Sequence, residues 1–574
     1  MQSKGRSLRR GLFRTFVPSL HAAGLALACA AAEAQPVVPD AGELQRRSQE
    51  SLQPPPSSRQ PAAAPGPAEP DRGGPRITVR RFAVEGATLI PEGELEARLA
   101  PLRGRPASMG ELQAAAEGLA DAYRERGWFA RAQIPPQDAS DGTLRIRVIE
   151  GRFGRLRSPG QAGLRANVPS IEALVGRRLP PGEPYSQDAL ERGLLLANDL
   201  PGVQVDGVLQ AGEAAGTSDL ELRIADQPLV SGFAGLNNAG SRSTGRAQAN
   251  AQLALDNPGG RGDQATLGLL AAEDLHYAVL GYSFPLGADG LRARLGASAL
   301  EYKLGDSFAA LDARGRSRTV TAGVAHPVLR TGTQSIWFSA DANEAHYQDE
   351  TLGVTLRDRR VTTLPLSAWG ERSDTLGGGG FTTWRLGLVP GKVRLGVDAA
   401  ADAAGPGTAG AFTRVPFDLR RDQRTGDASY LRVRVAGQWA DGNLDSSQKF
   451  GLGGPYGVRG FPGDDGQGDA GVLLQAEWHR ALAPAFDGFV FGDGGHIRQH
   501  MTPWPGWDAR STGHNSYGLA AAGLGLNWTP TASLQASLTV AWPLGGNPGS
   551  GIPDTNQDGS RIGPRAWLAL AYRF

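Results

Sequence analysis

Cysteine is almost absent from this 574-residue sequence, and the single one, Cys29, lies near the N-terminus. It falls in a short apolar stretch, Leu20–Ala32, that follows a strongly basic segment and runs into Ala32-Glu33-Ala34. This arrangement is typical of a secretory signal peptide, so we expect residues 1–34 to be removed on export. The exported chain would then have no disulfide and no thiol-bound metal. Cys29 as a lipoprotein acceptor is the alternative, although a lipobox prefers leucine where Ala26 stands.

Long apolar runs are also missing. No later segment reaches the 18 consecutive apolar residues of a membrane-spanning helix, and mean hydropathy is −0.30, which excludes a helical membrane protein. The net charge of +1 gives no basic footprint for nucleic acid. The sequence has no Walker loop, Gly-x-Ser-x-Gly elbow or His-Glu-x-x-His motif, so we expect neither enzymatic activity nor a cofactor.

Two patterns begin like metal sites but do not complete them. Asp554–Gly559 copies the start of an EF-hand loop, yet Arg565 stands where a bidentate glutamate is needed. His496 and His500 are four residues apart, which suits a metal on a helix, but they follow a predicted strand. We therefore expect no bound metal.

Proline is concentrated in the segment that follows the signal peptide, residues 35–75. Asp40–Gln53 is expected to form a short polar helix, with a disordered tail as the alternative because so short a helix is marginal alone. A proline-rich linker follows, which is expected to be extended. Its prolines are Pro54, Pro55, Pro56, Pro61, Pro65, Pro67, Pro70 and Pro75.

Two units with an α+β rhythm come next, at residues 76–151 and 152–226. In the first, a strand over Ile77–Val84 precedes a helix from about Pro91 to Leu102. A second helix begins at Ser108, because Ser108 and Glu111 form a capping-box pattern. The second unit repeats this outline with a helix over Gln187–Asn198. Each unit closes with a Gly-Thr dipeptide and an alternating strand.

Helical periodicity disappears from residues 227–574, where apolar and polar residues alternate in segments of about ten. The clearest are Leu431–Trp439, Ser533–Pro543 and the last ten residues, which end on Phe574. Soluble sandwiches also alternate, but strands of this length with aromatics near their ends are typical of a membrane barrel. In lipid only a closed sheet gives every strand backbone a partner, so we expect a mainly β chain that ends in a barrel.

Motifs within the expected barrel carry a family resemblance. Val458-Arg459-Gly460-Phe461 is similar to the VRGF motif, and Phe491-Gly492-Asp493-Gly494-Gly495 fits the FxDxG pattern. Ile134–Gln137 and Asn198–Gly202 are similar to phrases of POTRA domains. The sequence after residue 34 thus resembles the two-partner secretion transporters, the TpsB family (FhaC/ShlB-like) within the BamA-type superfamily of POTRA barrels.

The resemblance implies a 16-stranded antiparallel transmembrane β-barrel preceded by two α+β POTRA domains. It implies an N-terminal helix that can plug the pore, and it implies that Arg459, flanked by Val458, Gly460 and Phe461, enters the barrel and pairs with Asp493. A desolvated guanidinium needs such a partner, whereas a solvated surface turn is the alternative. The strand motif would comprise Phe491, Asp493 and Gly495. The signal for barrel assembly would comprise Leu570, Tyr572 and Phe574.

The resemblance also implies a function. A monomer in the outer membrane of a Gram-negative bacterium would bind a large unfolded exoprotein, adhesin-like or haemolysin-like, through its periplasmic POTRA domains. It would export that protein through the barrel, and its other partners would be membrane lipid and, during biogenesis, the barrel-assembly machinery. The alternatives are a BamA-like or TamA-like assembly factor, a passive porin and a soluble β protein. Two POTRA units, rather than three or five, favour transport.

Overall fold

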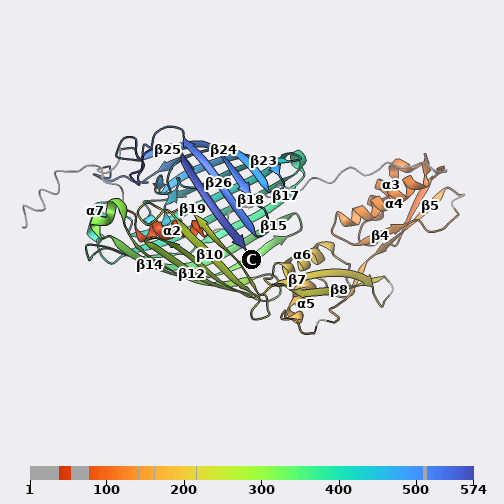
Figure 1. The fold of residues 1–574 in the computed structure, drawn as a ribbon. Coiled ribbons are helices and arrows are strands. Elements are labelled where there is room, and N and C mark those ends of the chain that lie inside the picture. The colour runs from red at the N-terminus through yellow and green to blue at the C-terminus, as the bar shows by residue number, and fades with distance from the viewer. Residues whose placement is uncertain (1–37, 53–75, 139–140, 161, 215, 509–512) are drawn as a thin grey trace, which may run out of the picture.

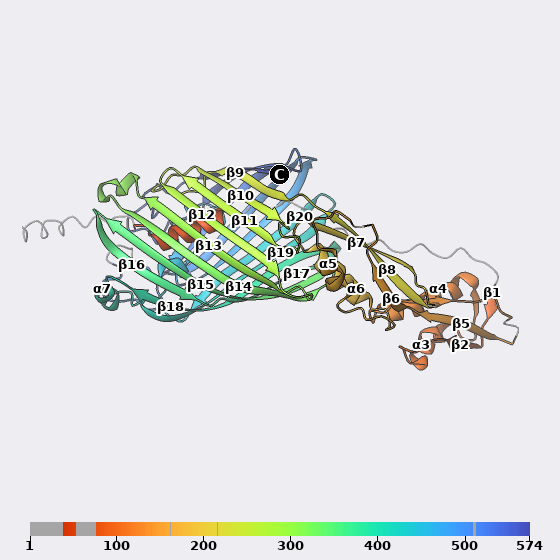
Figure 2. The same cartoon turned by 90° about the horizontal axis from the view of Figure 1, so that it is seen from below.

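The structure is a computed structural model that describes residues 38–52, 76–138, 141–160, 162–214, 216–508 and 513–574. The predicted signal peptide and proline-rich linker lie outside these residues. Within them, no helix is both long enough and apolar enough to cross a membrane. A large barrel forms one end of the molecule and two small α+β units extend from the other (Figures 1 and 2).

The barrel confirms the predicted 16 antiparallel strands and closes where the last strand, β27, pairs with the first, β9. Its strands are β9 (Val230–Asn237), β10 (Gln248–Asp256), β11 (Gln264–Ala272), β12 (Leu275–Pro285), β13 (Arg292–Lys303), β14 (Arg314–Arg330), β15 (Gln334–Thr351), β16 (Val354–Thr363), β17 (Leu366–Asp374), β18 (Gly380–Leu395), β19 (Gly410–Gly426), β20 (Ser429–Ala440), β23 (Ala470–Ala483), β24 (Phe486–Arg498), β25 (Ser516–Trp528), β26 (Leu534–Pro543) and β27 (Arg565–Arg573).

Strands β16 and β17 together make one strand of the barrel, interrupted by Leu364-Pro365. Both pair with β15 on one side and with β18 on the other. The interruption falls at a proline, which has no N–H to donate to a sheet ladder. Counting the two segments as one strand gives the even number expected of such a barrel.

Alternation along the strands sends apolar side chains outward and polar ones into the lumen. On β26, Trp542 is exposed on the outer wall while Gln535 is buried. On β15, Phe338 is exposed outside, whereas Asp341 faces inward and accepts a hydrogen bond from Arg294 at 2.7 Å. The period-2 segments of the sequence therefore predicted both the strands and their faces.

The first α+β unit contains a three-stranded sheet in the order β2-β5-β4 and a separate β1–β3 pair. The capping box of Ser108 and Glu111 is confirmed. The single strand expected over Ile77–Val84 is wrong, because β1 and β2 separate there and take different partners. Its elements are β1 (Arg76–Thr78), β2 (Arg81–Glu85), α3 (Glu92–Leu99), a 3-10 turn (Ala100–Leu102), β3 (Pro106–Ser108), α4 (Met109–Arg124), β4 (Ala130–Gln133) and β5 (Thr143–Glu150).

The second unit has the sheet order β6-β8-β7 and two helices, one more than the sequence pattern indicated. The extra helix, α5, is capped by Asn167, whose side chain accepts from the backbone N–H of Ser170. Its elements are β6 (Arg152–Arg157), α5 (Val168–Gly176), α6 (Gln187–Asn198), β7 (Val203–Ala211) and β8 (Thr217–Asp226).

The second unit contacts the near rim of the barrel at the turn between β14 and β15. Arg330 donates two hydrogen bonds to Asp199, at 2.8 Å each. The backbone N–H of Gly332 donates to Glu191 at 2.7 Å, and Arg192 donates to the carbonyl of Pro327 at 2.7 Å. These bonds fix the unit beside the barrel opening.

Candidate functional site

A short helix, α2 (Ala41–Ser51), lies inside the barrel (Figure 1). Its N-cap is Asp40, whose carboxylate accepts from the backbone N–H groups of Gly42 and Glu43. Leu44 is buried among residues of the barrel wall, and Gln45 donates to Thr319 at 2.9 Å. The alternative of a disordered tail is therefore wrong for Asp40–Leu52, because contacts with the wall stabilise a helix too short to persist alone.

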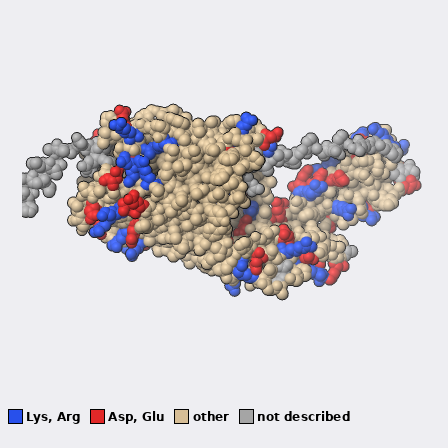
Figure 3. All heavy atoms as spheres, in the orientation of Figure 1, with Lys and Arg blue, Asp and Glu red and all other residues tan. Residues whose placement is uncertain are grey.

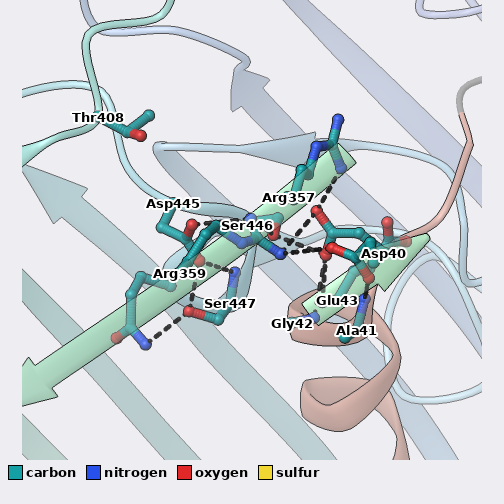
Figure 4. Close-up of polar contacts among 12 residues, drawn as sticks. Asp40, Ala41, Gly42, Glu43, Arg357, Arg359, Thr408, Asp445, Ser446 and Ser447 are labelled. Carbon is teal, nitrogen blue, oxygen red and sulfur yellow. Dashed lines mark hydrogen bonds and ion pairs between the residues drawn. The ribbon is translucent and has the colours of Figure 1, made fainter. Parts of the chain in front are cut away.

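The N-terminus of α2 is held by a buried ionic network (Figure 4). Arg357 and Arg359 on β16 lie 2.8 and 3.2 Å from Asp40. Arg359 also pairs with Asp445 at 2.8 Å and with Asp349 at 3.3 Å. Although burial raises the pKa of Asp40, the guanidinium groups of Arg359 and Arg357 hold it well below its usual range.

The polar face of α2 contacts the long loop, residues 441–469 between β20 and β23. Arg47 pairs with Asp464 of this loop and with Glu43. Burial, and next the nearby Asp464, raise the pKa of Glu43 to about 7 although Arg47 opposes the shift. Burial also raises the pKa of Asp465 to about 8. The helix and the loop thus form one electrostatic unit within the barrel.

Arg459 of the long loop reaches the barrel wall at Asp493 on β24. Its Nε and Nη2 donate to the two carboxylate oxygens at 2.8 and 2.7 Å, and its backbone N–H donates at 3.1 Å. Nη1 donates to Glu477 on β23 at 2.6 Å. The guanidinium carbon lies 3.6 Å from the ring centroid of Phe491, and the Arg459 carbonyl accepts from Trp567 at 2.8 Å.

The residues next to Arg459 pack the long loop closely against the barrel wall. Val458 and Phe461 are fully buried in one apolar cluster. A Cβ at Gly460 would lie 2.9 Å from the Cβ of Ala521, and a Cβ at Gly495 would meet Leu452 of the loop. Both glycines are therefore needed for the close approach of loop and strand. The structure brings together all the predicted residues of the loop and of the strand motif.

Sequence reasoning missed the polar chain that continues from Arg459 along β23. Glu477 lies between Arg459 and His479, which is 2.9 Å from Glu477 and 2.8 Å from Asp487. His479 is also stacked between Tyr430 and Phe489. The signal available in the sequence was that charged residues stand at the inward positions of a barrel strand. Such residues need partners, and the fold is required to identify them.

The C-terminal residues Leu570, Tyr572 and Phe574 are exposed on the outer wall, away from the lumen. Phe574 exchanges two backbone hydrogen bonds with Gly232, at 3.0 and 3.1 Å, and so completes the seam of the barrel. Their role as an assembly signal stays a prediction. Among the described residues no three potential ligands cluster as a metal site, and His500 packs edge-on against Trp504 instead.

The profile of the family described as haemolysin secretion/activation protein ShlB/FhaC/HecB matches residues 216–527, more than half of the chain. The chain belongs to this family. A second profile, the POTRA domain of ShlB type, matches residues 77–151. This membership makes the chain a two-partner secretion transporter of the outer membrane, with POTRA domains in the periplasm and a secreted exoprotein as partner.

Individual relatives are similar in sequence, and solved structures are similar in fold. The heme/hemopexin transporter protein HuxB of Haemophilus influenzae is 28% identical over 463 residues, covering 77% of this chain and 79% of HuxB. The structure of CdiB from Escherichia coli superposes with a TM-score of 0.67 at 23% identity, covering 89% of this chain and 94% of CdiB. BamA from Haemophilus ducreyi superposes less well, with a TM-score of 0.53 at 14% identity over 87% of this chain and all of that one, which shows the fold alone.

Proposed function

We propose that this transporter threads one large unfolded exoprotein, adhesin-like or haemolysin-like, from the periplasm through the barrel lumen as a monomer without enzymatic activity. The observation that carries the proposal is the lumen itself. Its lining includes many charged and polar side chains, it retains a cavity of about 1130 Å³, and α2 and the long loop both lie in it. Both elements are held by ion pairs, which can separate and re-form.

Arg459 and Asp493 act, in this proposal, as the lock that fixes the long loop during the resting state. The lock is supported by its bidentate geometry and by the burial of both side chains. The role of α2 as a plug is supported by the Asp40–Arg359 network that holds its N-terminus. Because α2 contacts the long loop through Arg47, release of one element would loosen the other.

The periplasmic units would receive the exoprotein as an added strand. Among the described residues, β7 pairs with one strand, β8. On its other edge the Asn198 side chain already bonds the backbone N–H and carbonyl of Val205, so residues 207–211 are the part that can accept an extended chain. Leu209 on this strand is exposed, which offers an apolar contact for the incoming side chains. Edge strands in other proteins are often blocked, but β7 contains no proline and no lysine.

Deletion of the gene tests the function. We expect one secreted protein to vanish from the culture supernatant while other outer-membrane barrels keep their levels. General loss of barrels would instead indicate an assembly factor of the BamA or TamA type. The neighbouring genes provide a second readout, because the partner should be a very large exported protein rich in β-helical repeats.

A further inference from the structure

The outer wall changes abruptly from apolar to charged residues near its extracellular end. On β14, Val320 and Val324 point outward and are exposed, and Arg318 is the next outward residue above Val320. On β18, Leu386 and Leu388 precede the outward Lys392 and Arg394. Figure 3 shows the same division, with a broad uncharged side wall and charged residues gathered at the end remote from the POTRA units. This boundary marks the level of the lipid headgroups.

Three arginines and one histidine are aligned across four strands at this boundary. Strand register places Arg318 opposite His346, His346 opposite Arg360, and Arg360 opposite Arg394. Like charges that face each other across neighbouring strands repel. Such a row is therefore unfavourable unless anions lie against it.

The protein supplies only part of the required negative charge. Glu344 lies 3.5 Å from Arg360, and Asp358 lies 2.8 Å from His346. Among the described residues no carboxylate pairs with Arg318 or Arg394. The row therefore carries an excess of positive charge at the depth where a membrane offers phosphate groups.

On the side of Arg318 away from His346, the same line of register-paired residues runs along an apolar groove of about 770 Å³ on the lipid-facing wall. Strand register takes it through the outward residues Ala299, Ala278, Leu269, Ala251, Ala234 and Tyr572. The small side chains leave the floor of the groove recessed, while Leu236 and Leu570 line it alongside. One end of a channel suited to an acyl chain thus meets the arginine row.

We propose that this surface binds one phosphorylated glycolipid of the lipid A class from the outer leaflet. An acyl chain lies in the groove, and the phosphate of the headgroup lies against Arg318, Arg360 and Arg394. Guanidinium groups bind phosphate with paired hydrogen bonds, and this charge complementarity selects an anionic lipid over a zwitterionic one. The extracellular position of the row selects the outer leaflet over the inner one.

Binding to the purified full-length chain tests the site by native mass spectrometry in detergent. The probes are bis-phosphorylated hexa-acyl lipid A, its dephosphorylated form and phosphatidylglycerol. We expect lipid A to bind at least tenfold more tightly than either comparison lipid. The triple variant Arg318→Gln, Arg360→Gln, Arg394→Gln should lose at least tenfold in lipid A affinity. A matched triple in the POTRA units, Arg80→Gln, Arg131→Gln, Arg223→Gln, should bind lipid A like the wild type.

A second variant tests the groove separately from the charges. Ala251→Trp with Ala278→Trp fills the groove and should weaken lipid A binding while leaving the arginines in place. Heat-modifiable migration on gels verifies that each variant has an assembled barrel. Unchanged lipid A affinity in the triple variant, or equal affinity for phosphatidylglycerol, would overturn the proposal.

Discussion

Arg459 and Asp493 meet through two parallel hydrogen bonds, 2.8 and 2.7 Å long, that join the long loop to the barrel wall. The Asp493 side chain is fully buried and that of Arg459 is 7% exposed. The loop backbone adds a third bond to the same carboxylate. The pair therefore determines where the loop sits, and its removal should alter transport rather than folding of the barrel.

The substitution Arg459→Ala should leave an assembled barrel and reduce secretion of the partner at least about tenfold. Loss of one member of a buried pair costs roughly 3–5 kcal/mol, which is enough to displace the loop. Arg459→Lys should not restore secretion, because an ammonium group cannot reproduce the bidentate bond. Secretion is measured in the supernatant and barrel level by immunoblot of outer membranes. Arg385→Ala, which removes a lumen-facing arginine that stacks on Trp369, is the control.

Weakening the anchor of α2 should open the pore. Arg359→Gln removes the group that joins Asp40, Asp349 and Asp445, so we expect larger and more frequent conductance steps in planar bilayers. Asp40→Asn should act in the same direction, and the two changes together should add less than their sum, because they remove one shared interaction. The control is Arg385→Gln, which removes one charge from the same lumen and should have the same conductance as the wild type. Identical traces from Arg359→Gln and wild type would contradict the anchor.

The plug should loosen as pH rises from 5 to 8. Burial and Asp464 raise the pKa of Glu43 from its ordinary 4.5 to about 7 in the seated helix. A raised carboxyl pKa stabilises the seated state below the ordinary value, and that contribution is lost as pH passes the raised one. Asp40 has a lowered pKa, and its contribution is constant over this range. We expect open probability to rise about tenfold or more. Glu43→Gln should flatten the profile, and a rise toward acid pH would refute this assignment.

The bond between Arg330 and Asp199 should restrict the second POTRA unit relative to the barrel. Both side chains are partly exposed, so we expect each alanine substitution to cost about 1 kcal/mol of docking energy. Distances between spin labels on the unit and the rim should broaden equally in Arg330→Ala, Asp199→Ala and the double variant. A further broadening in the double variant would show that the two residues act independently.

Elements with a repeating pattern could be predicted from the sequence. The alternation of Ser533–Pro543 gave β26 and its outward face, and the pairing of Ser108 with Glu111 gave the start of α4. Breaks in regular elements were harder to predict. Pro365, for example, divides a strand whose two parts both pair with the neighbouring strands. The short helix α5 has little periodicity to detect over nine residues.

The site was predictable only where a motif named its residues. Arg459 and Asp493 stand within two short motifs, and their contact was expected from the family resemblance. Asp349, Arg359 and Asp445 come from separate strands and loops and have no motif, so only the closed barrel brings them to Asp40. Glu477 is one charged residue among many along the sequence until the fold places it beside Arg459.

The central claim is that the exoprotein passes through the lumen that α2 occupies. Gln45 of α2 donates to Thr319 of the barrel wall at 2.9 Å, so cysteines placed at these two positions can be joined by a short bis-thiosulfonate linker that a reductant cleaves. The direct measurement is secretion of the partner by this double variant, with the linker in place and after reduction, with the extent of cross-linking followed on gels. We predict that the cross-linked barrel secretes almost nothing and that reduction restores secretion. Normal secretion through a fully cross-linked barrel would contradict the account.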